Sequence, residues 1–397
     1  MKRISIVLGL AFLASCASKN GLDRTFTIEN PAAVDRLAAV VGISIEQLGD
    51  ISVISNLDDI LVEDVLTQEK LRTQWVDNDQ DSTMDELLFL TGLTAGEKKD
   101  IRIYWQEGGS TLQPTSESTT YSRFVPERTD DYTWENDKVA FRTFGPEAQR
   151  MIEENIPGGT LSSGIDLWLK KVNYSIIDSW YEGNLKEGGY YHIDHGEGYD
   201  PYHVGKSRGT GGTGVWADDT LLTSKNFAAY RTIAIGPLRT VFELDYAPWS
   251  EYGVKETKRI TLDLGSNFSK YEISLSSDQP VPNYTIGITL HEKEGEVDLN
   301  GELGYYSHWE PIKGSQVGEG IVIDPTVVIK AFDFRTEVPD QSQLIVLTDS
   351  TLTTLTYYAG FAWTESGQVT TKEDWLQMLA NQKEIVDNPV KVNIDKP

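Results

Sequence analysis

Arg259-Ile260-Thr261-Leu262-Asp263-Leu264 alternates polar and aliphatic side chains over six residues. This period of two is the signature of a strand with one buried face. The same alternation appears in residues 284–290 and 344–348, and Gly, Asn, Asp and Pro separate such runs at short intervals. Aromatic residues make up 10% of the chain. These features predict a mainly β fold.

Few helices are expected. Pro146 stands where a first helical residue would, and residues 147–155 have fair helix propensity. Near the C-terminus, Thr371 and Asp374 form a capping-box pattern that precedes an apolar face. Residues 32–48 fit both a helix and a strand, and we expect extended structure there.

Domain boundaries follow from composition. A Gly-, Ser- and Thr-rich stretch at 107–117 contains few residues that pack, which is typical of a linker. We therefore expect a small β domain at 22–106 and a large catalytic β domain at 118–397. Residues 1–15 are expected to be a signal peptide, and 16–21 a lipidated tether.

The N-terminus predicts a lipoprotein. Lys2 and Arg3 precede an apolar run, 4–13, that is too short to span a bilayer. Leu13-Ala14-Ser15-Cys16 then matches a bacterial lipobox, so lipid on Cys16 would hold the chain to a membrane. An ordinary secretory signal is the alternative. Residues 17–20 contain neither an Asp beside Cys16 nor an acidic run, so we expect an outer-membrane lipoprotein that faces the periplasm.

Composition excludes several classes of function. Cys16 is the only cysteine, so neither an intrachain disulfide nor a cysteine-based metal site can form. The formal net charge is −26 at pH 7, and such a field repels nucleic acid. A serine-hydrolase elbow, a Gly-x-x-x-x-Gly-Lys-Ser/Thr phosphate loop and a strand-linked Gly-x-Gly-x-x-Gly nucleotide motif are not found in the sequence.

Residues 188–209 are unusually rich in side chains that can act as acids, bases or ligands. The segment holds three of the five histidines, four tyrosines, several carboxylates and a run of glycines. Glycines weaken strands, and unpaired buried His, Asp and Glu side chains are costly, so stability alone does not call for this mixture. The segment predicts a site whose backbone lies close to a ligand.

A local excess of positive charge points to an anionic ligand. Residues 201–240 contain five basic and two acidic residues within a strongly acidic chain. Arg208, Lys206 and Arg231 are the candidate groups, because guanidinium and ammonium groups bind carboxylate or sulfate. Structural neutralisation of nearby acids is the alternative for each of them.

No cofactor is expected, although a divalent metal was considered at two places. His192, Asp194, His195 and His203 are suitable ligand types without the spacing of a known zinc site. Residues 77–86 have the alternating Asp spacing of a calcium loop, but Ser82 stands where the loop needs Gly. A solvated turn between two strands is the alternative there.

Several ordered motifs resemble one family, and the likeness is densest at 132–246. The motifs are Glu135-Asn136-Asp137-Lys138-Val139-Ala140-Phe141-Arg142, Phe144-Gly145-Pro146-Glu147, Gly164-Ile165-Asp166-Leu167-Trp168, Tyr191-His192-x-Asp194-His195-Gly196-Glu197-Gly198, Val204-Gly205-Lys206-Ser207-Arg208-Gly209, and Tyr230-Arg231 to Gly236-Pro237. The family has long been labelled as of unknown function and occurs in secreted proteins of polysaccharide-degrading bacteria. At least one ulvan-degrading member is an oligosaccharide dehydratase.

The resemblance implies a galactose-mutarotase-like supersandwich with a smaller β domain in front. It also implies a lyase that removes water from a non-reducing-end uronic acid and leaves a 4,5-unsaturated uronyl residue. An acidic oligosaccharide would be the substrate. A mutarotase or epimerase, suggested by the expected fold alone, and a non-catalytic glycan-binding lipoprotein are the alternatives.

Dehydration needs a cation on the uronate carboxylate, a base for the C5 proton and an acid for the C4 hydroxyl. We expect His195 as base or acid, with His192 or Tyr191 as its counterpart and Tyr199 as a further candidate. Trp168 and Trp216 could stack on sugar rings, and His308 could face the same cleft. For each of these, packing in the core is the alternative.

Overall fold

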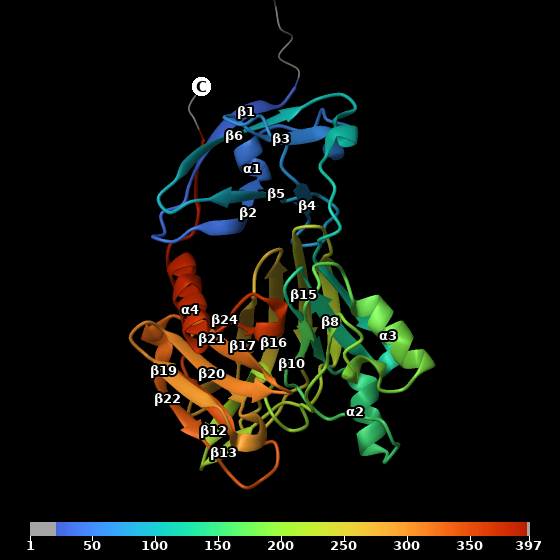
Figure 1. Cartoon of the computed structure of the whole chain (residues 1–397), viewed down its shortest axis with the longest axis vertical. Helices are drawn as coiled ribbons and strands as arrows, with labels where there is room; N and C mark the ends of the chain where they lie inside the picture. The colour runs from blue at the N-terminus through green and yellow to red at the C-terminus, as the bar shows by residue number, and fades with distance from the viewer. Residues whose placement is uncertain (1–20, 395–397) are drawn as a thin grey trace, which may run out of the picture.

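Eight antiparallel strands form the largest sheet, in which β16 contains residues 259–263 of the alternating stretch (Figure 1). The computed structural model describes residues 21–394. In spatial order the strands are β14 (Ala229–Ala234), β15 (Arg239–Asp245), β16 (Lys255–Asp263), β17 (Phe268–Ser276), β24 (Thr354–Trp363), β21 (Ser315–Ile323), β20 (Tyr305–Ile312) and β19 (Glu296–Asn300).

Two five-stranded sheets cover the inner face of this large sheet. One has the order β13 (Thr220–Leu222), β12 (Thr210–Ala217), β18 (Tyr284–Thr289), β23 (Gln343–Thr348) and β22 (Val328–Phe334). The other has the order β11 (Gly198–Tyr199), β10 (Asp166–Lys170), β9 (Ala140–Thr143), β8 (Asp131–Glu135) and β7 (Tyr121–Val125). All three sheets contribute to one continuous hydrophobic core, which includes Phe141, Ile260 and Ile286. The expected mainly β sandwich is confirmed.

Four α-helices are present in the described residues: α1 (Ile45–Leu48), α2 (Pro146–Glu153), α3 (Ile177–Lys186) and α4 (Lys372–Asp387). Helix α2 has Pro146 in its first turn, and α4 begins with the expected Thr371–Asp374 capping box. Trp375 and Leu379 bury the apolar face of α4 against the large sheet. Helix α3 was not expected. None of the described helices is long and apolar enough to cross a membrane.

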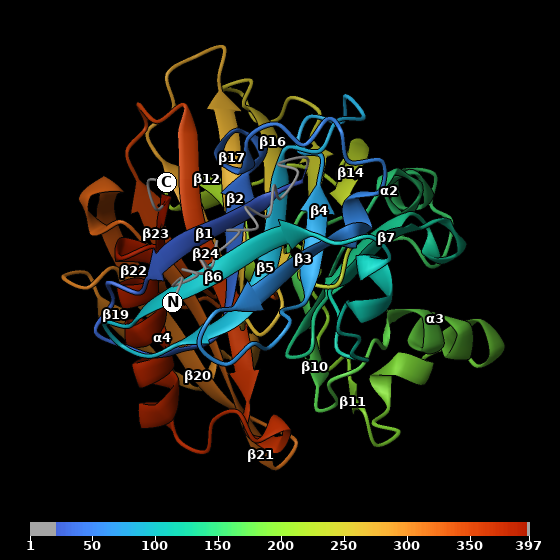
Figure 2. The same ribbon diagram turned by 90° about the horizontal axis from the view of Figure 1, so that it is seen from above.

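A smaller β unit lies above the large one (Figures 1 and 2). Its two sheets have the orders β25 (Lys391–Ile394), β1 (Asp23–Glu29), β6 (Lys98–Trp105), β3 (Ile60–Asp64), and β2 (Arg36–Ser44), β5 (Glu86–Leu93), β4 (Thr73–Val76). They enclose a separate core that includes Phe26, Phe89 and Ile101. The ambiguous residues 32–48 are mostly strand β2, as expected. Residues 77–85 form the loop between β4 and β5.

The domain boundary needs one correction. Residues 391–394 were assigned to the large domain, but β25 pairs antiparallel with β1, Phe26 opposite Ile394, in the small unit. The free edge of β1 accepts this strand after α4 has carried the chain up the side of the large sheet (Figure 1). A pairing between strands at opposite ends of the chain cannot be predicted from local composition.

The expected linker is ordered against the small unit. Residues 109–112 form a short 3₁₀ turn, and Gln113 donates hydrogen bonds to the carbonyl oxygens of Asp58 and Ile60. Gly109 packs so closely on Asp59 that a Cβ there would lie 2.6 Å from the Asp59 carbonyl oxygen. The stretch therefore connects the two units without being a loose tether.

Candidate functional site

A buried carboxylate–arginine cluster anchors the chemistry-rich segment 188–209. Strands β8, β9 and β10 place Asp131, Arg142 and Asp166 side by side, and Asp200 follows β11. Arg142 Nη2 lies 2.5 Å from Asp166 Oδ2 and 2.8 Å from Asp200 Oδ2. Asp131 Oδ2 is 3.8 Å from Arg142 Nη1.

The carboxylates of this cluster outnumber the cations that contact them. Burial raises the pKa of Asp131 to about 6, and the Arg142 and Arg128 guanidinium groups offset the rise only in part. Burial and the Asp166 carboxylate also raise the pKa of Asp200 well above its usual range. The cluster therefore favours protonation of a carboxyl group, and its dense hydrogen bonding holds the segment on the β7–β11 sheet.

Two of the four predicted catalytic residues, Tyr191 and His192, contact this cluster. Tyr191 is buried, and its hydroxyl accepts hydrogen bonds from Arg128 and Arg142. His192 is half exposed, with Nδ1 3.1 Å from the Asp200 carbonyl oxygen. His195 is exposed and stacks on Tyr190, with ring centres 4.0 Å apart.

Tyr199 is buried in a different environment. Burial raises the pKa of Tyr199 to about 12, and Lys313 Nζ lies 4.2 Å from its ring centre. Its hydroxyl has no hydrogen-bond partner among the described residues. The four residues are thus distributed along one segment, and none of them lines the cavity described next.

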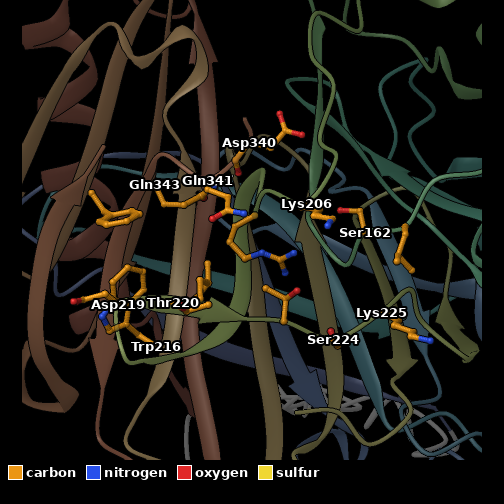
Figure 3. Close-up of a pocket in the computed structure, with 15 residues that line it drawn as sticks. Ser162, Lys206, Trp216, Asp219, Thr220, Ser224, Lys225, Asp340, Gln341 and Gln343 are labelled. Atoms are coloured by element: carbon orange, nitrogen blue, oxygen red, sulfur yellow. Dashed lines mark hydrogen bonds between the residues drawn. The ribbon is translucent and has the colours of Figure 1, made fainter. Parts of the chain in front are cut away.

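A cavity of about 280 Å³ opens beside β12 and β13 instead (Figure 3). Three predicted substrate-binding residues, Arg208, Lys206 and Trp216, line it together. The other lining residues come from three further segments: Leu161, Ser162, Asp219, Thr220, Leu221, Thr223, Ser224, Lys225, Phe334, Asp340, Gln341 and Gln343. Its volume is near the lower end of the roughly 300–1,000 Å³ found for small-molecule pockets.

Arg208 is a buried cation without a carboxylate partner. Its side chain is 1% exposed, and Nη1 donates to Ser163 Oγ and to the Thr213 carbonyl oxygen, both at 3.0 Å. Nε has no hydrogen-bond partner, and no ion pair to Arg208 forms within residues 21–394. Burial lowers the pKa of Arg208 to about 10, because the charged form loses its hydration.

A buried carboxylate, Glu256, and a buried lysine, Lys258, lie near Arg208. Glu256 accepts hydrogen bonds from Thr213 and from Ser224, which also lines the cavity. Lys258 Nζ lies 3.7 Å from Glu256 Oε1, and burial lowers its pKa. Glu256 is thus paired with Lys258, and it forms no ion pair with Arg208 within the described residues.

Asp340 and Asp219 line the cavity from left-handed backbone conformations, with φ of 62° and 56°. Asp219 belongs to the two-residue turn between β12 and β13, where Asp commonly adopts this geometry. Asp340 Oδ2 lies close to Gly205, beside His203 Nε2. Local sequence patterns do not point to Asp340, because 132 positions separate it from Arg208 (340 − 208) and only the fold closes that distance.

Three predicted substrate-binding residues lie elsewhere. Arg231 is exposed on β14 and forms an ion pair with Glu243 at 2.5 Å. Trp168 is buried in the packing of α3, where it stacks on Trp180 and Tyr191. His308 is buried on β20, and none of the three lines the cavity. Cys16, the predicted lipidation site, lies outside the described residues.

His308 belongs to a buried cluster of histidines and glutamates. It stands directly opposite Glu319 across β20 and β21, and its Nδ1 lies 3.9 Å from Glu319 Oε1. Glu310 follows on the same face of β20, with Oε2 3.8 Å from His308 Nε2. His291 Nε2, from the turn after β18, is also 3.9 Å from Glu319 Oε1.

The structure separates the ligand sets expected for a metal. Within residues 21–394, two groups bring ligand atoms within 4.8 Å of one another: His291–Glu310–Glu319 and Asp77–Asp79–Asp85. His192, Asp194, His195 and His203 do not form such a group. In the second group Asp77 accepts hydrogen bonds from the backbone N–H groups of Gln80 and Ser82, which is the geometry of a solvated turn.

The fold and the cavity define a two-unit β-sandwich protein with a pocket whose lining includes the cations Arg208, Lys206 and Lys225. The chain belongs to the family described as "Domain of unknown function (DUF4861)", whose model matches residues 28–392. A relative from Formosa agariphila, "Uncharacterized protein P7", is 42% identical over 400 residues, which cover 99% of this chain and 100% of the relative.

Two solved structures from Enterococcus faecalis match this chain. A glycosyl hydrolase family 38 protein matches with a TM-score of 0.52 and 8% identity, over 94% of this chain. An α-mannosidase matches with a TM-score of 0.46 and 8% identity, over 94% of this chain. The chain spans about half the length of these structures, 47% and 46% respectively. At this identity the likeness concerns the fold alone.

Proposed function

We propose that the protein is a carbohydrate-active lyase that dehydrates the non-reducing-end uronic acid of acidic, ulvan-type oligosaccharides. The product would carry a 4,5-unsaturated uronyl residue. The observation that supports this most directly is Arg208, a buried guanidinium on a cavity wall that no carboxylate of the described chain neutralises. A substrate carboxylate is the group that such a cation binds best.

The size and lining of the cavity favour a single sugar ring. A space of about 280 Å³ suits a terminal residue better than the middle of a polymer. Ser162, Thr220 and Gln343 offer hydroxyl and amide groups for sugar hydroxyls, and Trp216 offers an aromatic face. A charged carboxylate at Arg208 would fix the orientation of the ring.

The reaction breaks the C5–H and C4–O bonds, forms the C4–C5 double bond and releases water. Arg208 would stabilise the negative charge that spreads into the carboxylate when C5 loses its proton. Lys206 and Asp340 line the same cavity, so they replace His195 and His192 as our candidates for the proton transfers. The loop histidines remain the competing assignment.

We also propose that the protein is an outer-membrane lipoprotein, held through lipid on Cys16 and facing the periplasm, within a polysaccharide-degrading system. The support is the lipobox pattern at residues 13–16 and the resemblance described above. Labelling with a palmitate analogue in a bacterial host, compared between the natural chain and Cys16→Ala, tests the anchor. Equal labelling of both would contradict it.

Mass spectrometry tests the activity. The purified protein is incubated with saturated uronyl oligosaccharides from ulvan, and we expect the loss of one water together with absorbance from the new double bond. A product of unchanged mass and altered configuration would instead favour an epimerase or mutarotase. Binding without turnover across the panel would favour a non-catalytic glycan-binding protein.

A further inference from the structure

A second buried site lies apart from the cavity, in the cluster His291, His308, Glu310 and Glu319. Its residues come from the turn after β18 and from β20 and β21 (Figure 1). None of them lines the cavity. His308, Glu310 and Glu319 are at most 3% exposed, and the His291 side chain is 12% exposed. The cluster therefore needs an explanation of its own.

Two polar atoms in this cluster lack partners. His308 Nδ1 and Glu319 Oε1 are buried and form no hydrogen bond with the described residues, although they face each other at 3.9 Å. That distance is too long for a hydrogen bond. An unpaired buried carboxylate oxygen is costly, so a group between these atoms would remove a substantial penalty.

The remaining atoms of the same side chains are already held in place. Glu319 Oε2 accepts a hydrogen bond from Thr210 Oγ1, and His308 Nε2 lies 3.2 Å from the Glu294 carbonyl oxygen. Tyr202 donates to Glu310 Oε1 at 2.5 Å and stacks on His291 with ring centres 3.5 Å apart. Outer partners of this kind orient the ligands of metal sites.

We infer that His291, Glu310 and Glu319 bind a divalent transition-metal ion of the zinc type. Their ligand atoms already lie within 4.8 Å of one another, and an ion between them would draw them together. Imidazole together with carboxylate suits zinc and its neighbours better than calcium or magnesium, and three protein ligands leave a position open for water. His308 either completes the set or orients Glu319.

The inference does not depend on the proposed dehydratase, because it concerns metal binding alone. Metal content is measured on the full chain after treatment with a chelator, reloading with Zn²⁺, Mn²⁺ or Ca²⁺, and removal of free ion. We expect one Zn²⁺ per chain and a higher Tm than for the chelated protein. Absence of bound ion in all three preparations would overturn the inference and leave a metal-free ion pair between His308 and the glutamates.

Variants locate the ion. His291→Ala and Glu319→Gln should abolish stoichiometric Zn²⁺ binding, and His308→Asn should weaken it at least about 10–100-fold, the usual cost of removing even an orienting partner. Asp79→Asn, in the other acidic group, is the matched control and should bind as the natural chain does. Zn²⁺ binding that survives His291→Ala and Glu319→Gln but is lost in Asp79→Asn would contradict the site.

Spectroscopy on the natural chain covers the case in which Glu319→Gln fails to fold. Co²⁺ bound to the chelated protein should give visible d–d absorption that Zn²⁺ displaces, and Zn²⁺ should give an anomalous scattering peak between β20 and β21 in crystals. A peak at any other position would refute the assignment.

Discussion

Arg208 Nη1 donates a hydrogen bond to Ser163 Oγ over 3.0 Å, and that neutral hydroxyl stands where a buried arginine would ordinarily meet a carboxylate. The guanidinium is therefore fixed in direction but not neutralised. This is the arrangement expected of a group whose counter-ion is a ligand.

Arg208→Lys should lower kcat/KM for a uronyl-terminated oligosaccharide by roughly 10–100-fold, because a charged hydrogen bond contributes about 1.5–3 kcal/mol. Steady-state kinetics measure the change, and circular dichroism checks the fold. Arg231→Gln is the control, since Arg231 is an exposed residue paired with Glu243. Equal losses in both variants would contradict the assignment of the cavity.

Asp340→Asn should lower kcat by roughly 10²–10⁴-fold, the usual contribution of a positioned acid or base, with a smaller effect on KM. Asp218→Asn provides the comparison: Asp218 also has a left-handed backbone, at φ 48°, but does not line the cavity. A kcat in Asp340→Asn equal to that of the natural chain would contradict a role for Asp340 in the proton transfers.

His195→Ala separates the two assignments of the catalytic groups. His195 is exposed, stacks on Tyr190 and does not line the cavity, so we expect kcat/KM to stay close to that of the natural chain. If His195 is instead the base or acid expected from the sequence, this variant should lose nearly all activity. A near-total loss of activity with the fold intact would show that the catalytic groups lie in residues 188–200 and not in the cavity.

Asp131→Asn should change how stability depends on pH. Burial raises the pKa of Asp131 from its ordinary value near 3.8 to about 6 in the folded protein, so folding takes up a proton between these pH values. The free energy of unfolding of the natural protein should therefore fall as pH rises from about 4 to about 6, because the buried carboxyl must ionise. The asparagine variant has no such group and should not show this fall. Chemical denaturation across this range should show the free energy of unfolding of the variant rising relative to that of the natural protein as pH increases. A constant difference between the two would contradict the raised pKa.

Glu135→Gln should destabilise the fold by about 3–5 kcal/mol, because it leaves Lys170 buried without its counter-charge. Glu135 and Lys170 lie 2.6 Å apart with fully buried side chains. Urea denaturation gives the difference. Glu182→Gln, which removes an exposed pair with Lys186, should not change Tm measurably. A stability loss as large in Glu182→Gln as in Glu135→Gln would show that burial does not set the cost.

Helix α3 shows why part of the fold could not be predicted. Its N-cap residue, Ile176, has no side chain that can cap a helix, and Gly183 lies in its middle. The cap comes from Glu135 on β8, whose carboxylate accepts hydrogen bonds from the backbone N–H groups of Ile176 and Ile177. Gly183 makes room for the Tyr190 ring, which would lie 2.4 Å from a Cβ at that position. The cap from Glu135 and the packing of Tyr190 on Gly183 are both contacts made outside the helix, so the sequence of the helix does not reveal them.

The sequence by itself determined the mainly β class, the start of α2 at Pro146 and the capping box of α4, because each depends on neighbours within a few residues. It also singled out Arg208, Lys206 and Trp216, which share one cavity. Only the tertiary structure decided that Asp340 joins them, that His192 and His195 do not, and that β25 closes the small unit. These outcomes depend on strand pairings between distant segments, and local patterns do not encode which strand pairs with which.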